Sequence, residues 1–557
     1  MANRIKDSFR LALAQLNPIV GDIDGNLKKA RAARETAAAR GADLVAFTEL
    51  YLTGYPIEDL VLKPALQEAA WQACEAFARD TGDGWPAVLV GLPWGDGSFV
   101  YNALALLDAG RIAAVRYKNN LPNYGVFDEK RVFATGPMPE PIDFRGVKLG
   151  VPVCEDIWSE EVCAGLAKAG SELLIVPNGS PYWMDKQTQR YDVARARIAE
   201  TGLPLTYVNQ IGGQDELVFD GASFALNVDG SVAMQMPAWQ EAIGIMEWRR
   251  EEAGWRCLPG DMAEIEVGEA ANYLACVTGL RDYVEKNGFP GAVLGLSGGI
   301  DSALCAAMAV DALGASRVHC VMLPYRYTSN ESLSDAAKGA ETLGVRYDIL
   351  PIHEAVEGLT KSLAPVFAGT KEDATEENFQ SRARGTMLMA MSNKFGPIVL
   401  TTGNKSEVSV GYATLYGDMN GGFNPIKDLY KTQVYAVARY RNSARPKGCL
   451  GPEGIVIPEN ILTKAPTAEL KADQRDQDTL PPYDVLDDIL NCLVEREMQL
   501  AGIVARGHAP EVVKKVERML YLAEYKRRQA APGVKITAKN FGRDRRYPIV
   551  NKFRETL

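Results

Sequence analysis

The stretch Leu296-Ser297-Gly298-Gly299-Ile300-Asp301-Ser302 decides the fold of the second half of this chain. It follows the apolar run Ala292–Leu296, which predicts a buried strand, and it leads into 302–313, which predicts a helix. Paired glycines allow a sharp turn and close approach to a ligand, and a helix N-terminus favours phosphate. An ordinary strand-to-helix turn would also use these residues. A Walker A loop is excluded because no Gly-Lys-Ser/Thr follows.

The segments around this loop alternate between strand and helix patterns. Apolar runs at Val318–Leu323, Arg346–Leu350 and Ile398–Thr402 predict strands, and 268–287, 332–343 and 380–395 predict helices. Such a succession is typical of a doubly wound parallel sheet, in which ligands bind beyond the carboxyl ends of the strands. We therefore expect the loop to lie at a binding edge.

The first half of the chain has a second layered α/β pattern. Apolar runs predict strands and Ala-rich segments predict helices, with the strands at Leu11–Leu16, Leu44–Phe47, Val88–Leu92, Leu104–Leu107, Leu149–Val153, Leu173–Val176 and Leu205–Val208 and the helices at 27–40, 64–79, 159–169 and 185–200. The composition changes over 235–268, around Pro259-Gly260. We therefore predict one domain over 1–250, a linker over 251–268 and a second domain over 269–557.

Composition excludes several classes of protein. The chain has 557 residues, 47% of them hydrophobic, and a formal net charge of −10, which disfavours a nucleic-acid or anionic-membrane partner. No stretch approaches the roughly 18 apolar residues of a membrane span. Nine scattered cysteines without a Cys-x-x-Cys pair fit the reducing cytoplasm. Two short basic runs, 526–528 and 543–546, are expected to be solvated unless a phosphate site lies nearby.

Several motifs accompany the glycine loop in order along the chain. They are Glu377-Asn378-x-Gln380-x-Arg382-x-Arg384, Thr401–Glu407, Gly417-Asp418, Asp428–Val434 and Ala465–Leu470. The loop resembles that of enzymes that split ATP into AMP and pyrophosphate, and the whole set over 270–535 resembles the NAD⁺ synthetase family. That resemblance implies an adenine-nucleotide α-hydrolase type of fold. It also implies ATP contacts from Gly295, Leu296, Ser297, Gly298, Gly299, Ile300, Asp301, Ser302, Thr402, Lys431 and Thr467.

The same resemblance implies the other ligands of this half. Asp301 and Glu407 are expected to hold Mg²⁺, and Asn378, Glu407 and Lys526 to contact nicotinic acid adenine dinucleotide. The chain departs from the ammonia-only members of the family, which have a lysine where it has Leu415 and an aspartate where it has Gly422. Because these two positions differ, the expected dinucleotide contacts are the least secure of the expected ligand contacts.

Three polar residues of the first half follow apolar strands. Glu49 follows Leu44–Phe47, Cys154 follows Leu149–Val153, and Lys118 precedes the segment Leu121–Glu129. The three histidines, 319, 353 and 508, all lie in the second half, so a thiol hydrolase in the first half needs a carboxylate or lysine as base. Taken singly, a strand-end Glu or Lys is usually solvated, and a Cys between apolar residues usually packs in a core.

Together these segments resemble the Glu-Lys-Cys triad of the nitrilase superfamily, over residues 10 to about 230. The resemblance implies an α-β-β-α sandwich in which Glu49 is the general base, Cys154 the nucleophile and Lys118 the oxyanion-stabilising cation. It further implies glutamine contacts from Tyr124, Ser180 and Lys186, neighbours at Tyr55, Glu129 and Glu155, and a homo-oligomer.

The pair of resemblances predicts a ligase that releases ammonia from glutamine in one domain and uses it with ATP in the other. Asparagine synthetase needs an N-terminal cysteine, whereas this chain begins Met1-Ala2, and GMP synthetase needs a histidine that the first half lacks. Two other classes stay open. A tRNA-thiolating enzyme shares the ATP loop but favours a basic surface, and a non-catalytic scaffold would have broken motifs.

Overall fold

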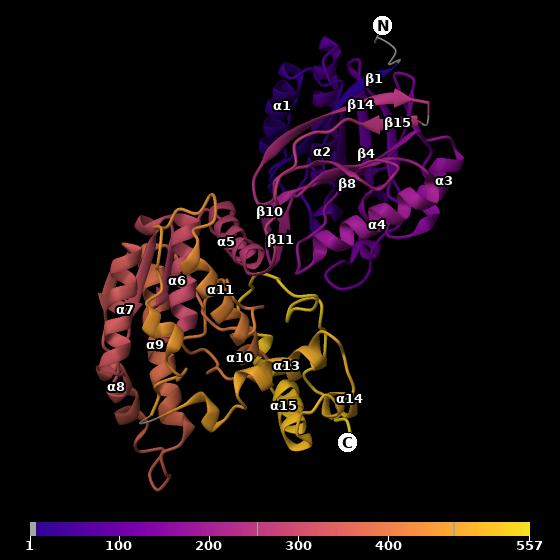
Figure 1. The fold of residues 1–557 in the computed structure, drawn as a ribbon. Helices are drawn as coiled ribbons and strands as arrows, with labels where there is room; N and C mark the ends of the chain where they lie inside the picture. The colour runs from indigo at the N-terminus through magenta and orange to yellow at the C-terminus, as the bar shows by residue number, and fades with distance from the viewer. Residues whose placement is uncertain (1–6, 253, 472–473, 557) are drawn as a thin grey trace. The chain divides into compact units, whose positions relative to one another are not determined.

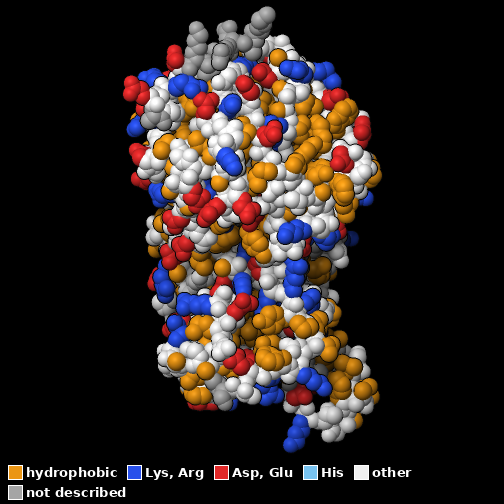
Figure 2. All heavy atoms as spheres, turned by 90° about the vertical axis from the view of Figure 1, so that its right-hand side faces the viewer, with side chains coloured by type: hydrophobic (Ala, Val, Ile, Leu, Met, Phe, Trp, Pro, Cys, Tyr) orange, Lys and Arg blue, Asp and Glu red, His pale blue; other side chains and the backbone are white. Residues whose placement is uncertain are grey.

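The computed structural model describes residues 7–252, 254–471 and 474–556. The chain divides into two compact units, Met1–Gln214 with Val218–Glu266 and Asp215–Leu217 with Val267–Leu557. Each unit has its own sheets and its own buried core. Acidic and basic side chains are interspersed over the face in Figure 2. Within the described residues, none of the helices combines the length and the apolar character that a membrane crossing requires.

The first unit is built on two large sheets. One has the strand order β15 (Gly254–Cys257), β14 (Ala242–Glu251), β1 (Ser8–Gln15), β2 (Leu44–Ala46), β3 (Ala87–Gly95), β4 (Val100–Asp108) and β5 (Arg111–Tyr117). The other has the order β13 (Val232–Gln235), β12 (Phe224–Leu226), β9 (Leu205–Asn209), β8 (Leu173–Asn178), β7 (Val147–Gly150) and β6 (Ile142–Phe144). A separate hairpin joins β10 (Ile211–Gln214) to β11 (Leu217–Asp220).

Strand alternation explains how these sheets stack. Leu11 and Leu13 of β1 share a buried cluster with Leu173 and Ile175 of β8, which places this core between the two sheets. The intervening residue Ala12 faces α1 (Ile23–Ala39) and α2 (Pro64–Asp80), on the outer side of the first sheet.

The outer side of the second sheet is covered in the same way. Leu174 and Val176, which alternate with the inward residues of β8, pack on α3 (Glu160–Lys168) and α4 (Lys186–Thr201). Figure 1 shows the two helix pairs on opposite sides of this unit. The predicted α-β-β-α sandwich is confirmed.

The stretch that we expected to be a linker contains part of the first sheet. Strand β15 falls within 251–268 and pairs antiparallel with β14, which in turn pairs with β1 across the whole of Ser8–Gln15. Sequence patterns missed these strands because exposed charged residues such as Arg249 and Glu251 interrupt the apolar alternation of an edge.

The second unit is built on a four-stranded parallel sheet. Its strand order is β18 (Arg346–Ile349), β17 (Val318–Met322), β16 (Ala292–Gly295) and β19 (Ile398–Leu400). Val293, Val321 and Val399 pack toward α8 (His353–Leu363) and α9 (Ala374–Phe395). The other helices of this part of the unit are α5 (Gly268–Lys286), α6 (Ile300–Leu313), α7 (Asn330–Leu343), α10 (Lys405–Val410) and α11 (Lys431–Ser443). The predicted doubly wound parallel sheet is confirmed.

A helical extension completes this unit. It consists of α12 (Glu459–Thr463), α13 (Tyr483–Val494), α14 (Leu500–Ala505), α15 (Pro510–Leu522) and α16 (Glu524–Arg527). Leu486, Ile503 and Val516 meet in one buried cluster, and Val408 of α10 packs against the same cluster. The extension is therefore fastened to the helix that follows β19 (Figure 1).

A fully buried ion pair anchors α6 behind the glycine loop. Arg441 of α11 donates from Nε to Asp311 Oδ2 over 2.6 Å, and neither side chain is exposed to solvent. Tyr273 of α5 donates its hydroxyl to the same carboxylate, and the Gly451 amide donates to Asp311 Oδ1 over 3.0 Å. One carboxylate thus joins three helices and a loop.

We predict that Arg441→Ala destabilises the region around α6 by about 3–5 kcal/mol, because it leaves the Asp311 carboxylate buried without its cation. Amide hydrogen exchange of α6 measures the loss. The matched control is Arg445→Ala, whose partner Glu453 is 80% exposed and whose pair contributes about 1 kcal/mol or less. Equal exchange in the two variants would contradict the anchoring role.

Candidate active sites

In the first unit, three predicted residues gather at the ends of strands. Glu49 follows β2, Lys118 follows β5 and Cys154 follows β7. Glu49 and Lys118 are 0% exposed and Cys154 is 6% exposed. Because β2 and β7 belong to different sheets of the sandwich, the cluster draws residues from both layers.

The Lys118 ammonium lies between two carboxylates. Its Nζ is 2.7 Å from Glu49 Oε1 and 2.8 Å from Glu129 Oε2. Burial opposes the positive charge, but Glu129 and Glu49 outweigh it and hold the pKa of Lys118 well above its usual value. Burial raises the pKa of Glu129 to about 7, against the opposing effect of Lys118. The two carboxylates keep a permanent cation in an almost fully buried site.

Cys154 is held in a strained backbone conformation. Its φ is +45°, a left-handed value that few non-glycine residues adopt. The Asp156 carboxylate fixes the turn, because it accepts from the Val153 amide over 2.9 Å and from the Asn120 amide over 2.7 Å. These two bonds tie the Cys154 turn to the segment that follows Lys118.

The Cys154 thiol is not acidic by itself. Burial raises its pKa well above the usual value, the nearby Glu49 adds to this effect, and Lys118 opposes it. A thiol of this kind needs a base to become a nucleophile, and Glu49 is the carboxylate that acts on it most strongly.

Sequence reasoning missed two donors that hold Glu49. Asn102 of β4 donates from Nδ2 to Glu49 Oε1 over 2.7 Å, and the Gly179 amide donates to Oε2 over 2.9 Å. At Gly179 a Cβ would come 2.4 Å from the Tyr55 ring, so only glycine fits there. Asn102 lies in an ordinary apolar strand, which carried no signal for this role.

The predicted glutamine contacts lie around this cluster. Tyr124 is 54% exposed and donates its hydroxyl to Glu155. Ser180 is buried, and its hydroxyl accepts from Arg190 Nε over 3.2 Å. Lys186 is buried with its ammonium 3.5 Å from the centre of the Trp183 ring and 4.0 Å from that of Trp158.

Burial, and then the charge of Arg190, lower the pKa of Lys186 to about 6. A buried amine with so low a pKa regains its charge when an anion binds beside it. Of the expected neighbours, Tyr55 donates to Glu129 Oε1 over 3.0 Å, which fixes the orientation of that carboxylate.

In the second unit, the glycine loop connects β16 to α6 as predicted. Gly298 has a φ of +79°, and a Cβ there would come 2.3 Å from the Ser332 carbonyl oxygen. The Ser302 hydroxyl accepts from the Ser297 amide over 3.2 Å, and Ser297 Oγ accepts from the Gly299 amide over 3.2 Å. These hydrogen bonds within the loop stabilise its conformation.

A pocket of about 480 Å³ opens beside the loop. Its lining includes the predicted residues Gly295, Leu296, Ser297, Gly299, Ile300, Asp301, Ser302, Asn378, Thr402, Glu407, Lys431, Thr467 and Lys526. Gly298 does not line it and instead packs against α7, because its role is to let the backbone turn.

Two carboxylates of this pocket share one ammonium. Lys431 Nζ pairs with Asp301, and it lies 3.3 Å from Glu407 Oε1. Asn404 Nδ2 donates to the other oxygen of Asp301 over 2.8 Å. Burial raises the pKa of Glu407 to about 7, Lys431 opposes this, and Asp301 adds to it. Asp301 and Glu407 thus converge on a single cationic position.

The remaining predicted residues are engaged with the pocket wall. Lys526 donates to the Gly411 and Ala413 carbonyls over 2.8 and 2.7 Å, and burial lowers its pKa. Asn378 accepts from Thr414, and Thr467 donates to the Gln474 carbonyl over 2.6 Å. In the described parts of the chain, His, Cys, Asp and Glu side chains do not gather in threes as a ready-made metal cluster.

Comparison with known proteins decides the family. Residues 10–254 match the carbon-nitrogen hydrolase family model and residues 273–530 match the NAD synthase model. A glutamine-dependent NAD(+) synthetase of Rhodobacter capsulatus is 53% identical over 549 residues, 99% of each chain. The chain belongs to the glutamine-dependent NAD(+) synthetase family. The homologue from Acinetobacter baylyi is 44% identical and covers 98% of this chain and 99% of its own.

Solved structures agree with this family. The glutamine-dependent NAD⁺ synthetase of Acinetobacter baumannii, determined in complex with ADP, is 44% identical, with a TM-score of 0.78 over 98% of this chain and 99% of that one. The Cytophaga hutchinsonii glutamine-dependent NAD(+) synthetase has a TM-score of 0.81 over 98% of each chain at 22% identity, which shows the fold. Full-length membership of this family leaves no room for the tRNA-thiolating alternative.

We predict that Lys118→Met lowers the free energy of unfolding by about 3–5 kcal/mol well above pH 7, because Glu49 and Glu129 then share a buried site without a cation. Lys118 lowers the pKa of Glu129, so its removal raises that pKa further, and a raised carboxyl pKa favours the folded state as pH falls. The deficit therefore shrinks as the pH is lowered.

Tryptophan fluorescence during urea unfolding measures this deficit, since all eight tryptophans lie between residues 71 and 255. The control is Lys29→Met, whose pair with Glu241 is solvent-exposed on both sides and contributes about 1 kcal/mol or less. A Lys118→Met protein as stable as the wild type at every pH would show that the carboxylates do not depend on this ammonium.

Proposed function

We propose that the chain converts nicotinic acid adenine dinucleotide to NAD⁺, with ATP as the activating substrate and the glutamine side chain as the source of ammonia. One observation carries this proposal. A buried Glu-Lys-Cys cluster suited to amide hydrolysis and a glycine loop suited to ATP occur in one chain, within a family of glutamine-dependent NAD(+) synthetases. The two chemistries are complementary, because one releases ammonia and the other needs it.

In the first unit, Cys154 attacks the side-chain amide carbon of glutamine. Glu49 takes the thiol proton and passes it to the departing nitrogen, so that ammonia leaves and a glutamyl thioester remains. Lys118 stabilises the negative oxygen of the tetrahedral intermediate, which its closed and charged position favours. Water activated by Glu49 then hydrolyses the thioester and restores the thiol.

Three side chains orient glutamine for this attack. Tyr124 and Ser180 supply hydrogen bonds, and Lys186 pairs with the α-carboxylate of the amino acid. Burial and Arg190 lower the pKa of Lys186 to about 6, and a carboxylate that binds beside it restores its charge. Arg190 supports this arrangement, since it is fully buried and holds the Ser180 hydroxyl and carbonyl.

In the second unit, the triphosphate and ribose of ATP bind to the pocket residues Ser297, Gly299, Ile300, Asp301, Ser302, Thr402, Lys431 and Thr467. Amides at the start of α6 and the Lys431 ammonium favour negative charge. Asn378, Glu407 and Lys526 contact the dinucleotide. Its carboxylate oxygen attacks the α-phosphorus and pyrophosphate leaves, after which ammonia attacks the adenylated carbonyl carbon and AMP leaves.

The carboxylates of Asp301 and Glu407 suit Mg²⁺. They already converge on one cation, and Mg²⁺ is usually held by one or two carboxylates together with substrate phosphates and water. When bound, the ion neutralises phosphate charge and favours departure of pyrophosphate. Lys431 would then turn from the carboxylates to the phosphates.

Two wider expectations stay predictions. The resemblance to nitrilase-like domains favours a homo-oligomer, and the nine cysteines, all buried and unpaired, favour the cytoplasm. The substrates proposed here are small molecules, and neither a nucleic acid nor a membrane enters the reaction.

We predict that Cys154→Ala abolishes NAD⁺ formation from glutamine and leaves formation from added ammonium salt largely intact, because the thiol forms the thioester and takes no part in adenylation. Both nitrogen sources are compared in the same protein preparation. The matched control is Cys163→Ala, a buried core thiol of α3, which is expected to keep both activities. Equal loss with both sources would mean that Cys154 supports the fold or the synthetase site instead.

A further inference from the structure

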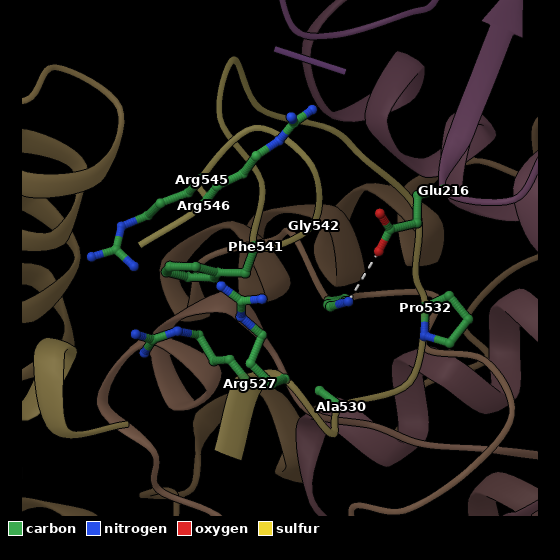
Figure 3. A pocket seen from close by; sticks show the side chains of 10 residues that line it. Glu216, Arg527, Ala530, Pro532, Phe541, Gly542, Arg545 and Arg546 are labelled. Atoms are coloured by element: carbon green, nitrogen blue, oxygen red, sulfur yellow. Dashed lines mark hydrogen bonds and ion pairs between the residues drawn. The ribbon is translucent and has the colours of Figure 1, made fainter. Parts of the chain in front are cut away.

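The two basic runs near the C-terminus converge on one pocket of the second unit. This pocket, of about 300 Å³, is lined by Glu216, Lys427, Arg527, Arg528, Ala530, Pro532, Phe541, Gly542, Arg545 and Arg546. Sequence patterns predicted a solvated face for each run unless a phosphate site lay nearby, and residues of both 526–528 and 543–546 contribute to the wall (Figure 3). None of these residues lines the pocket beside the glycine loop.

The lining carries a strong excess of positive charge. Among the described residues that line it, five have cationic side chains and one, Glu216, has a carboxylate. Lys427 pairs with Glu216 over 3.1 Å. Arg527, Arg528 and Arg545 all share the single carboxylate of Glu524. One carboxylate cannot neutralise three guanidinium groups, so the pocket attracts anions.

Two of these arginines, Arg527 and Arg545, are buried. Arg527 is 6% exposed, and its Nη2 donates to Glu524 over 2.7 Å. Its Nε–H is buried and has no hydrogen-bond acceptor among the described residues. Burial lowers the pKa of Arg527 to about 10, a sign that its charge is incompletely compensated.

Aromatic rings hold the arginines in a fixed geometry. The Arg545 guanidinium lies 3.6 Å from the centre of the Tyr547 ring. The Phe541 ring has Arg527 at 4.8 Å and Arg545 at 5.8 Å, and Figure 3 shows it between them. Guanidinium groups fixed in this way lose little freedom when they bind an oxyanion.

We infer that this pocket binds a phosphate-bearing anion at a site separate from the ATP pocket. A phosphate or pyrophosphate group carries more than one negative charge and presents acceptors in several directions, which matches cations arranged around a small cavity. A monocarboxylate offers a single charge in one plane. The site does not depend on the proposed reaction, because none of its lining residues belongs to either catalytic cluster.

Binding of inorganic pyrophosphate to the full-length protein tests this inference by isothermal titration calorimetry without divalent metal. Ala530→Glu adds a carboxylate at an exposed lining position and removes no contact of the fold, and Arg546→Ala removes an exposed cation. Each is expected to weaken binding by at least about tenfold. The matched controls, Ala501→Glu and Arg518→Ala, change exposed residues of α14 and α15 outside the pocket.

Several outcomes would overturn the inference. The wild type could fail to bind pyrophosphate at millimolar concentration, or Ala530→Glu could bind as tightly as Ala501→Glu, which would place the anion elsewhere. Equal affinity for acetate would refute the phosphate chemistry. AMP distinguishes the two sources of a phosphate group through the part of its binding that Ala530→Glu weakens. If that binding is tighter than for pyrophosphate, the site takes a nucleotide, and if it is weaker, the site takes an inorganic anion.

Discussion

A buried lysine ammonium held between two carboxylates is the interaction on which both sites of this chain depend. Lys118 lies between Glu49 and Glu129 in the first unit, and Lys431 lies between Asp301 and Glu407 in the second. A charge in the protein interior is tolerated only when it is paired and hydrogen-bonded, so each lysine requires its partners at a fixed distance. The strand ends and helix starts that carry these carboxylates must therefore lie within hydrogen-bond distance of the lysine.

The two clusters serve different chemistry. In the first unit the cation is permanent, because an oxyanion that forms beside it must be stabilised while the base and the thiol keep their places. In the second unit the carboxylates converge on a position where a metal ion would bind, next to the phosphates of a nucleotide. We therefore propose that Lys118 stays between its carboxylates throughout the reaction, whereas Lys431 leaves its carboxylates when metal and phosphates bind.

Much of this architecture could be predicted from the sequence. The motif residues Glu49, Cys154 and Ser297–Ser302 follow apolar strands, and strand ends are where open sheets and sandwiches display functional groups. The alternation of β1 and β8 likewise predicts which side chains enter the core. In each case the signal is local, because the deciding residues are neighbours in the chain.

The parts that escaped prediction depend on contacts between distant residues. Asn102 reaches Glu49 across 53 positions of sequence, and nothing near it in the chain suggests that bond. Strand β14 pairs with β1 across most of the first unit, with charged residues on its exposed face. The close approach of Gly298 to Ser332, where a Cβ would come 2.3 Å from the carbonyl oxygen, also joins residues that are far apart in the sequence. The two basic runs form one pocket only in the folded chain, because they are separate in the sequence.

The central claim is that this single chain transfers one nitrogen atom from the glutamine side chain to the dinucleotide. The most direct measurement supplies glutamine labelled with ¹⁵N in its side-chain amide as the only nitrogen source, with ATP, Mg²⁺ and nicotinic acid adenine dinucleotide, and analyses the product by mass spectrometry. The account predicts NAD⁺ with the label in its carboxamide. Glutamine hydrolysis without labelled NAD⁺ would contradict it.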